Sequence, residues 1–402
     1  MNIPQGYKQT ELGIIPEDWE LISIKERGCL VKDGINPMLF PNVSFWEYSM
    51  PAFDNGKQPT LSLGEEMHSN RTIIRDTVLL FNKLNVRQQR VWFVESPSVD
   101  SVCSMEFLPY VSKSINLEFL YHYLKTDVVT DYFNGISKGT SNSQKRITPQ
   151  DFLDYKVILP PIAEQRAIAE ALNDVDGLIA ALDKKIAKKR LLKQGAMQQL
   201  LTGKKRLPGF TDEWVEKTLG EIGTLSMCKR IFQEETSDSG DVPFYKIGTF
   251  GQEADAFISK AKYESYKNMY RFPSKGDILI SAAGTIGRTV VYDGKPAYFQ
   301  DSNIIWLAHT QKHILNIYLS YVYQIINWNI ENTTIARLYN DNFNNTVVLF
   351  PKSLVEQQAI ATILSDMDKE IADLEVQRDK YRLLKSGMMQ KLLTGEIRFK
   401  NE

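Results

Sequence analysis

A long segment occurs twice in this chain, and the repeat limits the folds that are possible. Residues 164–203 and 356–395 align without a gap at a constant offset of 192, and 23 of the 40 aligned positions are identical. Chance does not produce this agreement, so the chain contains a duplication. Any fold proposed for it must use this segment twice.

Both copies have the apolar spacing that is typical of a coiled-coil helix, with alternating steps of four and three residues. In the first copy the apolar residues are Ile168, Leu172, Val175, Ile179, Leu182 and Ile186. In the second copy they are Ile360, Leu364, Met367, Ile371 and Leu374, and Arg378 replaces the sixth. Each helix would be about 60 Å long. Because neither can bury its stripe alone, we expect the two helices to pack against each other.

Two more variable segments, roughly residues 25–157 and 220–348, precede the helices. Each follows an acidic residue and a tryptophan, Asp18-Trp19 in the first case and Glu213-Trp214 in the second. The order is therefore globule, helix, globule, helix. Because the globules mix short strands with helices, we assign the fold to the α+β class.

The two globules share an outline despite their low identity. Residues 76–80 and 276–280 both have the apolar composition of a buried strand, and we align them with each other. Residues 119–124 resemble the helix-like residues 318–323 in the same way.

The charge balance excludes a globally basic protein. Lys and Arg number 48 and Asp and Glu number 49, so any nucleic-acid-binding surface must be local. The three cysteines are far apart and form no CxxC pair, which argues against a disulfide scaffold or a zinc site. We find no apolar run of about 18 residues and no signal peptide, and so expect a cytoplasmic protein that does not span a membrane.

Two loops of the first globule are basic and carry no acidic residue. Arg, Asn and Gln can pair with base edges, and Lys can neutralise phosphate, so these loops are candidates for DNA contact. The alternatives are a solvated hairpin tip and a flexible linker. The candidate residues are Lys83, Arg87, Gln88 and Arg90 in the first loop, and Lys138, Thr140, Ser141, Asn142, Gln144, Lys145 and Arg146 in the second.

The second globule offers a corresponding set. Residues 282–289 follow a strand but lack the first glycine and the lysine of a P-loop, and their two glycines are typical of a tight turn. Residues 332–339 occupy the position of the second basic loop. The DNA-contact candidates here are Arg230, Tyr245, Lys246, Thr285, Arg288, Thr333, Arg337 and Tyr339.

Basic residues also cluster on the first repeated helix. Such a run usually marks a solvated helix face, and the alternative is a phosphate-facing role. The cluster consists of Lys184, Lys185, Lys188, Lys189, Arg190 and Lys193.

Catalytic motifs are missing. We find no [ND]PP[YFW] tetrad for base methylation, no Walker motif, no HExxH and no convincing nuclease cluster. Methylation or cleavage, if it occurs, would belong to partner proteins.

The whole pattern resembles the specificity subunits of type I restriction–modification systems. The resemblance rests on the DW and EW starts, the EQxAIA helix openings, the RLLKxGxMQxLLTG helix ends and GDILISAAGTIGR in the second globule. In the first globule, residues 77–83 stand in for that last motif, which makes its contact residues harder to place.

The resemblance implies a non-catalytic reader of a two-part DNA site. It implies a first target-recognition domain at residues 1–158, a first spacer helix at 159–206, a second recognition domain at 207–349 and a second spacer helix at 350–402. The implied partners are double-stranded DNA, two methyltransferase subunits, and translocase/nuclease subunits for restriction. No cofactor is expected on this chain, because S-adenosylmethionine, ATP and Mg²⁺ would bind the partners.

Two other functions fit a duplicated chain with basic loops. One is a stand-alone DNA-binding nuclease, and the other is a coiled-coil scaffold that binds no DNA. Cleavage or modification of DNA by the purified chain with Mg²⁺ alone would favour the nuclease.

Overall fold

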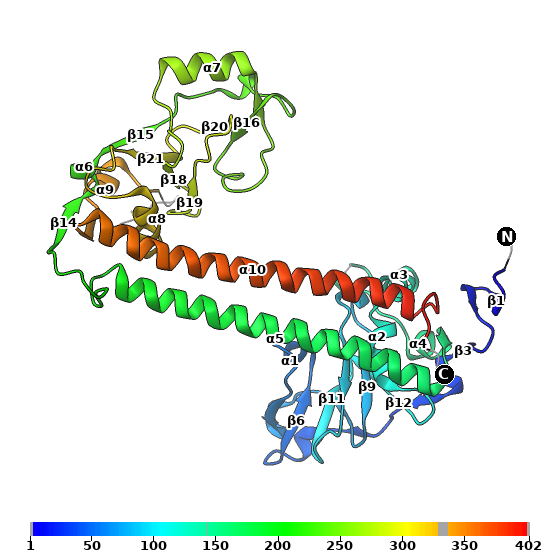
Figure 1. The fold of residues 1–402 in the computed structure, drawn as a ribbon. Helices are drawn as coiled ribbons and strands as arrows, with labels where there is room; N and C mark the ends of the chain where they lie inside the picture. Colours follow the sequence, from blue (N-terminus) through cyan, green and yellow to red (C-terminus); the bar gives the residue numbers. More distant parts are fainter. Residues whose placement is uncertain (1–2, 142, 329–336, 400–402) are drawn as a thin grey trace. The chain divides into compact units, whose positions relative to one another are not determined.

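The computed structural model describes residues 3–141, 143–328 and 337–399. Their contacts divide the chain into two compact units, one formed by residues 1–183 and 377–402 and the other by residues 184–376. Each unit combines one globule with part of each of two long helices, α5 (Ile162–Leu200) and α10 (Leu354–Leu392) (Figure 1).

The first globule is an α+β structure, as expected. Its elements are β1 (Tyr7–Thr10), β2 (Gly13–Pro16), β3 (Glu20–Ser23), β4 (Gly28–Leu30), β5 (Gly34–Ile35), β6 (Ser44–Tyr48), α1 (Met50–Asp54), β7 (Thr60–Leu63), β8 (Arg71–Ile73), β9 (Val78–Asn82), β10 (Val91–Val94), β11 (Ser101–Ser104), β12 (Phe107–Ser112), α2 (Leu117–Leu124), α3 (Asp127–Ile136), α4 (Pro149–Asp154) and β13 (Lys156–Leu159). One sheet has the strand order β10-β9-β12-β4, and another has the order β5-β8-β11-β6-β7.

The second globule repeats this plan, with fewer strands among its described residues. Its elements are β14 (Trp214–Thr218), α6 (Leu219–Ile222), β15 (Thr224–Met227), β16 (Val242–Tyr245), β17 (Phe257–Ile258), α7 (Lys260–Met269), β18 (Ile278–Ser281), β19 (Thr289–Val291), β20 (Tyr298–Phe299), β21 (Ile304–Ala308), α8 (Asn316–Ile325), α9 (Asn340–Asn344) and β22 (Val347–Pro351). Its larger sheet has the order β19-β18-β21-β15, which matches β10-β9-β12-β4 strand for strand. The duplication therefore includes the globules.

The two expected buried strands are confirmed as β9 and β18, but our alignment of them was wrong by one residue. Leu79 and Phe81 pack into the core beneath α5, and Ile278 and Ile280 pack into the equivalent core beneath α10. Equivalent residues therefore differ by 199 and not by 200. Every residue of both strands is buried, so their composition has no alternation that could fix which face is which.

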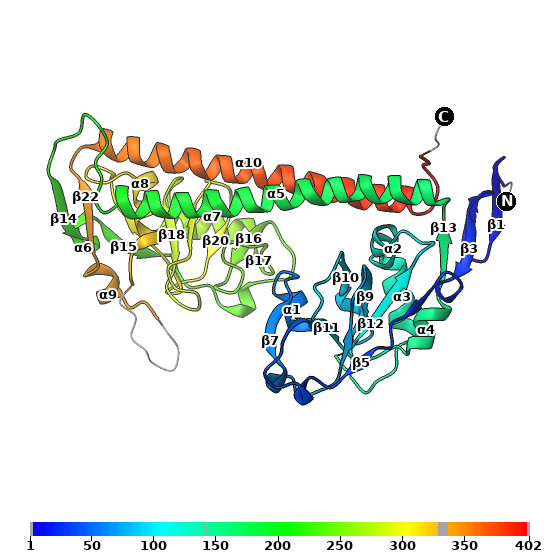
Figure 2. The same ribbon diagram turned by 90° about the horizontal axis from the view of Figure 1, so that it is seen from below.

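The helices pack together as expected and run antiparallel, side by side in both views (Figure 2). In the first unit Ile168 and Leu172, near the start of α5, share a core with Leu392 at the end of α10. In the second unit Ile360, near the start of α10, shares a core with Leu200 at the end of α5. Ile179, near the middle of α5, is only half-buried, whereas Ile186, one heptad further along the helix, is 2% exposed.

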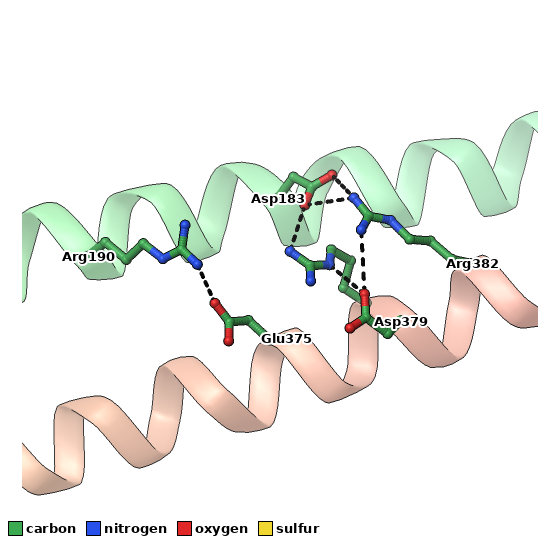
Figure 3. Close-up of polar contacts among 6 residues, drawn as sticks. Asp183, Arg190, Glu375, Asp379 and Arg382 are labelled. Carbon is green, nitrogen blue, oxygen red and sulfur yellow. Dashed lines mark hydrogen bonds and ion pairs between the residues drawn. The ribbon is translucent and has the colours of Figure 1, made fainter. Parts of the chain in front are cut away.

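Ion pairs connect the helices, and two pairs of the first unit, Asp183–Arg382 and Asp176–Lys385, have counterparts in the second unit at an offset of 192. Asp183 accepts from Arg382 at 3.2 Å in the first unit, and Glu375 pairs with Arg190 in the second (Figure 3). Partly exposed pairs of this kind contribute about 0–1 kcal/mol each, so they favour one register more than they add stability.

Three residues of the basic run belong to these interhelical pairs. Lys189 bonds to Glu370 at 2.6 Å, Lys193 bonds to Asp368 at 2.5 Å, and Arg190 pairs with Glu375. The run is therefore neither wholly a solvated face nor wholly available for phosphate.

A tryptophan, an arginine and a buried glutamate close each unit. In the first unit Arg398 makes two 2.8 Å bonds to Glu164 and lies 5.4 Å from the ring centre of Trp19. In the second unit Arg206 bonds to Glu356 at 2.7 and 2.8 Å and lies 5.7 Å from the ring centre of Trp214. This duplicated contact explains why tryptophans before the globules and glutamates at the helix starts recur in the sequence.

Candidate nucleic-acid interface

The two basic loops of the first globule lie against each other. Lys138 and Arg146 exchange two backbone hydrogen bonds of 2.9 Å, which close the second loop into a hairpin. The backbone of that hairpin then bonds to the first loop, from Asn85 N to Lys145 O at 2.8 Å and from Ile147 N to Lys83 O at 3.1 Å. Loops that are about sixty residues apart in the sequence thus form one surface at the end of β9.

The first loop is held in a fixed shape by its backbone. Asn85 and Gln89 both adopt left-handed conformations, with φ of 51° and 47°, on either side of a short 3-10 turn. Val86 anchors the turn in the core, while Arg87 and Gln88 beside it are exposed. These two side chains are therefore presented to solvent by a rigid turn.

Arg90 faces a different environment. Its Nε and Nη2 donate to the two carboxylate oxygens of Asp54, each at 2.8 Å, and its side chain is 16% exposed. The hydrogen bond from Arg90 lowers the pKa of the Asp54 carboxyl. Arg90 thus ties the loop to α1, and the exposed Arg87 is better placed to reach a ligand.

The second loop presents most of its candidate side chains to solvent. Lys138, Thr140, Ser141, Gln144 and Arg146 are exposed, and Lys145 is half-buried. Asn142 lies outside the described residues.

Gly139 allows the hairpin to close. Its φ is +156°, and a Cβ there would lie 2.8 Å from the carbonyl oxygen of Gln144. Because a side chain at this position would collide with the opposite side of the hairpin, only glycine fits here.

The second globule brings its candidate residues to the same end of the equivalent strand. Leu338 N donates to Ala282 O at 2.8 Å, just as Ile147 N does to Lys83 O, and Arg337 forms a bridge with Ala283 as Arg146 does with Leu84. Thr285 is exposed at the tip of the 282–288 loop. The loop-on-loop arrangement therefore occurs once in each globule.

The glycines of the 282–288 loop serve its turn, as expected. Gly284 and Gly287 have φ of 64° and 82°, and a Cβ on Gly287 would lie 2.4 Å from Nε1 of Trp328. Arg288 is half-buried and donates to the carbonyl oxygen of Phe250 at 2.9 Å.

A corner at residues 300–303 gathers further candidates of the second globule. Arg230 bonds to Asp301 at 2.8 Å, Arg337 donates to Ser302 O at 3.3 Å, and the carbonyl of Tyr245 accepts from Gln300 N at 2.9 Å. Lys246 pairs with Asp255 at 2.9 Å. Tyr339 is 42% exposed, and Thr333 lies outside the described residues.

No sequence pattern indicated the carboxylates that hold these cations. Glu106, which directly precedes β12, accepts from Nε and Nη2 of Arg146 at 3.2 Å each. Asp54 and Asp301 play the same part for Arg90 and Arg230. Each acid comes from a segment 36 to 71 residues away from its partner, so no local pattern could have identified it.

The described residues contain no group of three or more His, Cys, Asp or Glu side chains that could hold a metal ion. In the same part of the chain, no helix is both long and apolar enough to cross a membrane.

Comparisons with known proteins agree on one family. The family described as "Type I restriction modification DNA specificity domain" matches residues 93–189 and 211–380. A putative type I restriction enzyme specificity subunit of Haemophilus influenzae is 38% identical over 261 residues, which cover 64% of this chain and 65% of that relative. The putative MjaX specificity subunit of Methanocaldococcus jannaschii is 24% identical over 98% of this chain and 97% of its own length.

Solved structures show the same fold. The type I restriction–modification S subunit of M. genitalium superposes with a TM-score of 0.61 at 16% identity, over 100% of this chain and 99% of that one. A chain from a study of complex assembly and conformational transition in a type I system gives 0.60 at 19% identity, over 95% and 99% of the two chains. This chain belongs to the type I restriction–modification DNA specificity family, the non-catalytic specificity subunits of those systems.

Proposed function

We propose that the globules, within residues 1–158 and 207–349, each bind one half of a two-part DNA target. The observation that carries this is the repeated pair of loops at the ends of β9 and β18. In both globules these loops present arginines together with hydroxyl or amide groups on a rigid backbone. Such groups can bond to base edges and to phosphates.

In this proposal the candidate residues divide into two classes. Exposed lysines such as Lys138 contact phosphate, and Arg87, Gln88 and Arg146 reach bases from the first globule. Thr285 and Arg337 do so from the second, with Tyr339 beside them. Arg90, Arg230 and Arg288 are held by other protein groups and shape the surface.

The helices, within residues 159–206 and 350–402, supply the docking surface for partner subunits. Leu191 and Leu192 are 69% and 51% exposed on α5, and their repeat equivalents Leu383 and Leu384 are 75% and 49% exposed on α10. An exposed apolar pair that occurs twice indicates a partner present in two copies. We identify that partner as the methyltransferase subunit.

The chemistry then belongs to the partners in the cytoplasm. The methyltransferase subunits carry S-adenosylmethionine and methylate adenine, and a translocase/nuclease subunit with ATP and Mg²⁺ carries out restriction. The chain itself selects the double-stranded DNA site.

The direct experiment is to map methylated adenines across the genome with and without this gene. We expect one two-part motif with an unread spacer to lose methylation when the gene is deleted. Retention of every methylated motif, or loss of an uninterrupted one, would contradict the proposal.

A further inference from the structure

Two lysines of the first unit converge on one tyrosine hydroxyl. Lys57 Nζ and Lys125 Nζ both donate to the Oη of Tyr121, at 3.1 and 3.2 Å. Their ammonium groups also lie 5.3 and 4.8 Å from the centre of the Tyr121 ring. Neither lysine pairs with a carboxylate among the described residues, so two like charges are held close together by neutral groups. Such an arrangement attracts an anion.

The tyrosine has a hydrogen-bond donor to offer such an anion. Its oxygen accepts from both lysines, and its own O–H has no acceptor within the described part of the chain. Burial opposes ionisation of Tyr121, yet the nearby Lys125 and Lys57 together lower its pKa. Negative charge is therefore favoured at this position.

Lys57 and Tyr121 line an open pocket of about 240 Å³ whose other walls include Trp92, Glu118 and Asp176, and Lys125 reaches its edge through the Tyr121 hydroxyl. Asp176 is neutralised by Lys385 at 2.6 Å, and Glu118 accepts from the amide of Asn173 at 2.8 Å. Neither carboxylate pairs with the two lysines. The pocket keeps a net positive charge and has room for a tetrahedral anion.

The pocket adjoins the first candidate loop on two sides. Lys57 lies over the ring of Phe53, which packs edge-on against Trp92 and directly precedes the Asp54 that holds Arg90. On the other side, Gln89 of the loop donates to Thr130 at 2.9 Å, close to Lys125 in the chain. A DNA strand that contacts the loop would therefore run past the pocket.

We propose that Lys57, Lys125 and Tyr121 bind one phosphate of the DNA backbone beside the bases that the first globule reads. This inference rests on the proposed function. The equivalent positions of α8 carry Ser320 and Gln324, at the offset of 199 that relates the two globules. The second globule lacks the corresponding cation and ring, so the phosphate site is specific to the first half of the target.

The test uses the chain assembled with its methyltransferase partner and a duplex that contains its methylated site. Each phosphate of the first half-site is replaced in turn by a neutral methylphosphonate. With the wild type we expect one replacement to weaken binding clearly. In the Lys57→Gln/Lys125→Gln variant that position should no longer matter, and the slope of log affinity against log salt should fall by about one.

Three matched variants complete the test. Lys125→Arg keeps the charge and should behave as the wild type, Tyr121→Phe should lose part of the methylphosphonate effect, and Gln324→Ala should change nothing. If the double lysine variant fails to fold, Tyr121→Phe decides, because it removes one oxygen atom only. Thermal unfolding of each variant shows whether it is folded.

The outcomes separate this site from the proposed function. Wild-type binding with an unchanged methylphosphonate profile and salt slope in the folded variants overturns the phosphate site and leaves DNA reading intact. The site is also overturned as a DNA contact if the variants lose only the binding of inorganic phosphate, measured by ³¹P NMR. Failure of the wild type to bind its own methylated site overturns the proposed function and this inference with it.

Discussion

Arg146 and Glu106 form a side-on pair in which Nε and Nη2 of the arginine each donate to one carboxylate oxygen at 3.2 Å. A guanidinium group has a second edge, and the Arg146 side chain is 44% exposed. An arginine held in this way can still offer two parallel donors to O6 and N7 of guanine. Glu106 would then orient the guanidinium group of Arg146 and keep it from adopting other orientations.

We expect Arg146→Ala to cost about 1–3 kcal/mol of binding energy on the cognate site and much less on random DNA. Arg146→Lys keeps the charge but loses the paired donors, so it should lose specificity and retain non-specific binding. Glu106→Gln should likewise lower the ratio of cognate to random affinity, because the guanidinium group of Arg146 is no longer held by a carboxylate. Equal losses on both DNAs would make Arg146 a phosphate contact.

Acid should weaken the first unit through one histidine. His122 is buried on α2, where its Nε2 bonds to Asn173 Oδ1 at 2.8 Å, and burial lowers its pKa to about 4 from an ordinary 6.5. The unfolded chain therefore binds a proton more readily than the folded one between these values. Stability from this residue is complete above pH 6.5 and is lost as the pH falls towards 4.

The expected loss between pH 7 and pH 5 is roughly 2 kcal/mol, at about 1.36 kcal/mol per pKa unit. Urea unfolding at the two pH values measures it. In His122→Gln, which has no titrating group here, the pH dependence should shrink by that amount. An unchanged dependence would mean that His122 is protonated in the folded state.

The sequence could predict the positions of the helices better than the contacts between loops. The positions of α5 and α10 followed from a regular apolar spacing, and Ile168 and Ile360 are buried as that spacing requires. The contact between Lys138 and Arg146 was within reach, because the two residues bracket one loop. The contact between Asn85 and Lys145 was not, because pairing between distant loops leaves no periodic signal.

The same limit applied to the candidate arginines. Residue type indicated that Arg87 and Arg90 could both contact DNA, but the Asp54 that occupies Arg90 lies on a different element. Exposure and pairing, which separate the two arginines, depend on tertiary structure. Sequence reasoning could therefore propose both arginines as DNA contacts and could not rank them.

The exposed leucine pairs should matter for assembly and not for folding. Leu191→Asp combined with Leu383→Asp should leave the thermal unfolding of the isolated chain within a few degrees of the wild type, since the two residues are 69% and 75% exposed. Binding of the methyltransferase subunit, followed by sedimentation, should fall at both sites. The buried Leu172→Asp is the contrasting control, because it should unfold the first unit.

Either single leucine variant should then retain one bound partner. The repeat places one leucine pair in each unit, so the two docking sites are expected to be independent. Loss of both partners from a single substitution would show that one surface binds both. Binding of two partners by the double variant would show that the leucines are not part of the interface.

The globules should be exchangeable one at a time. Replacing residues 25–157 with the corresponding segment of another family member keeps Trp19, Glu164 and Arg398, which close the first unit. We therefore expect a folded chain whose methylated motif changes in one half only. Methylation mapping in which both halves change together would show that recognition is shared between the globules.

The last prediction tests whether the helices set the length of the unread spacer. An insertion before Thr202 would come between Leu201, which packs in the core of the second unit, and Arg206, which bonds to Glu356. Matched insertions between residues 183 and 184 and between residues 376 and 377 avoid this, because both points fall between the units. Whole heptads keep the apolar seam in phase.

Three heptads in each helix add about 32 Å at ~1.5 Å per residue. That length corresponds to about nine base pairs at ~3.4 Å each, which is close to one turn of DNA. One added turn of DNA would leave the two half-sites facing the same way as before, so both globules could still bind them. We therefore expect a spacer longer by about nine or ten base pairs with both half-sites unchanged. One heptad adds only about three base pairs, roughly a third of a turn, so it should abolish binding. Methylation at the original spacer in the three-heptad variant would show that the helices do not set the distance.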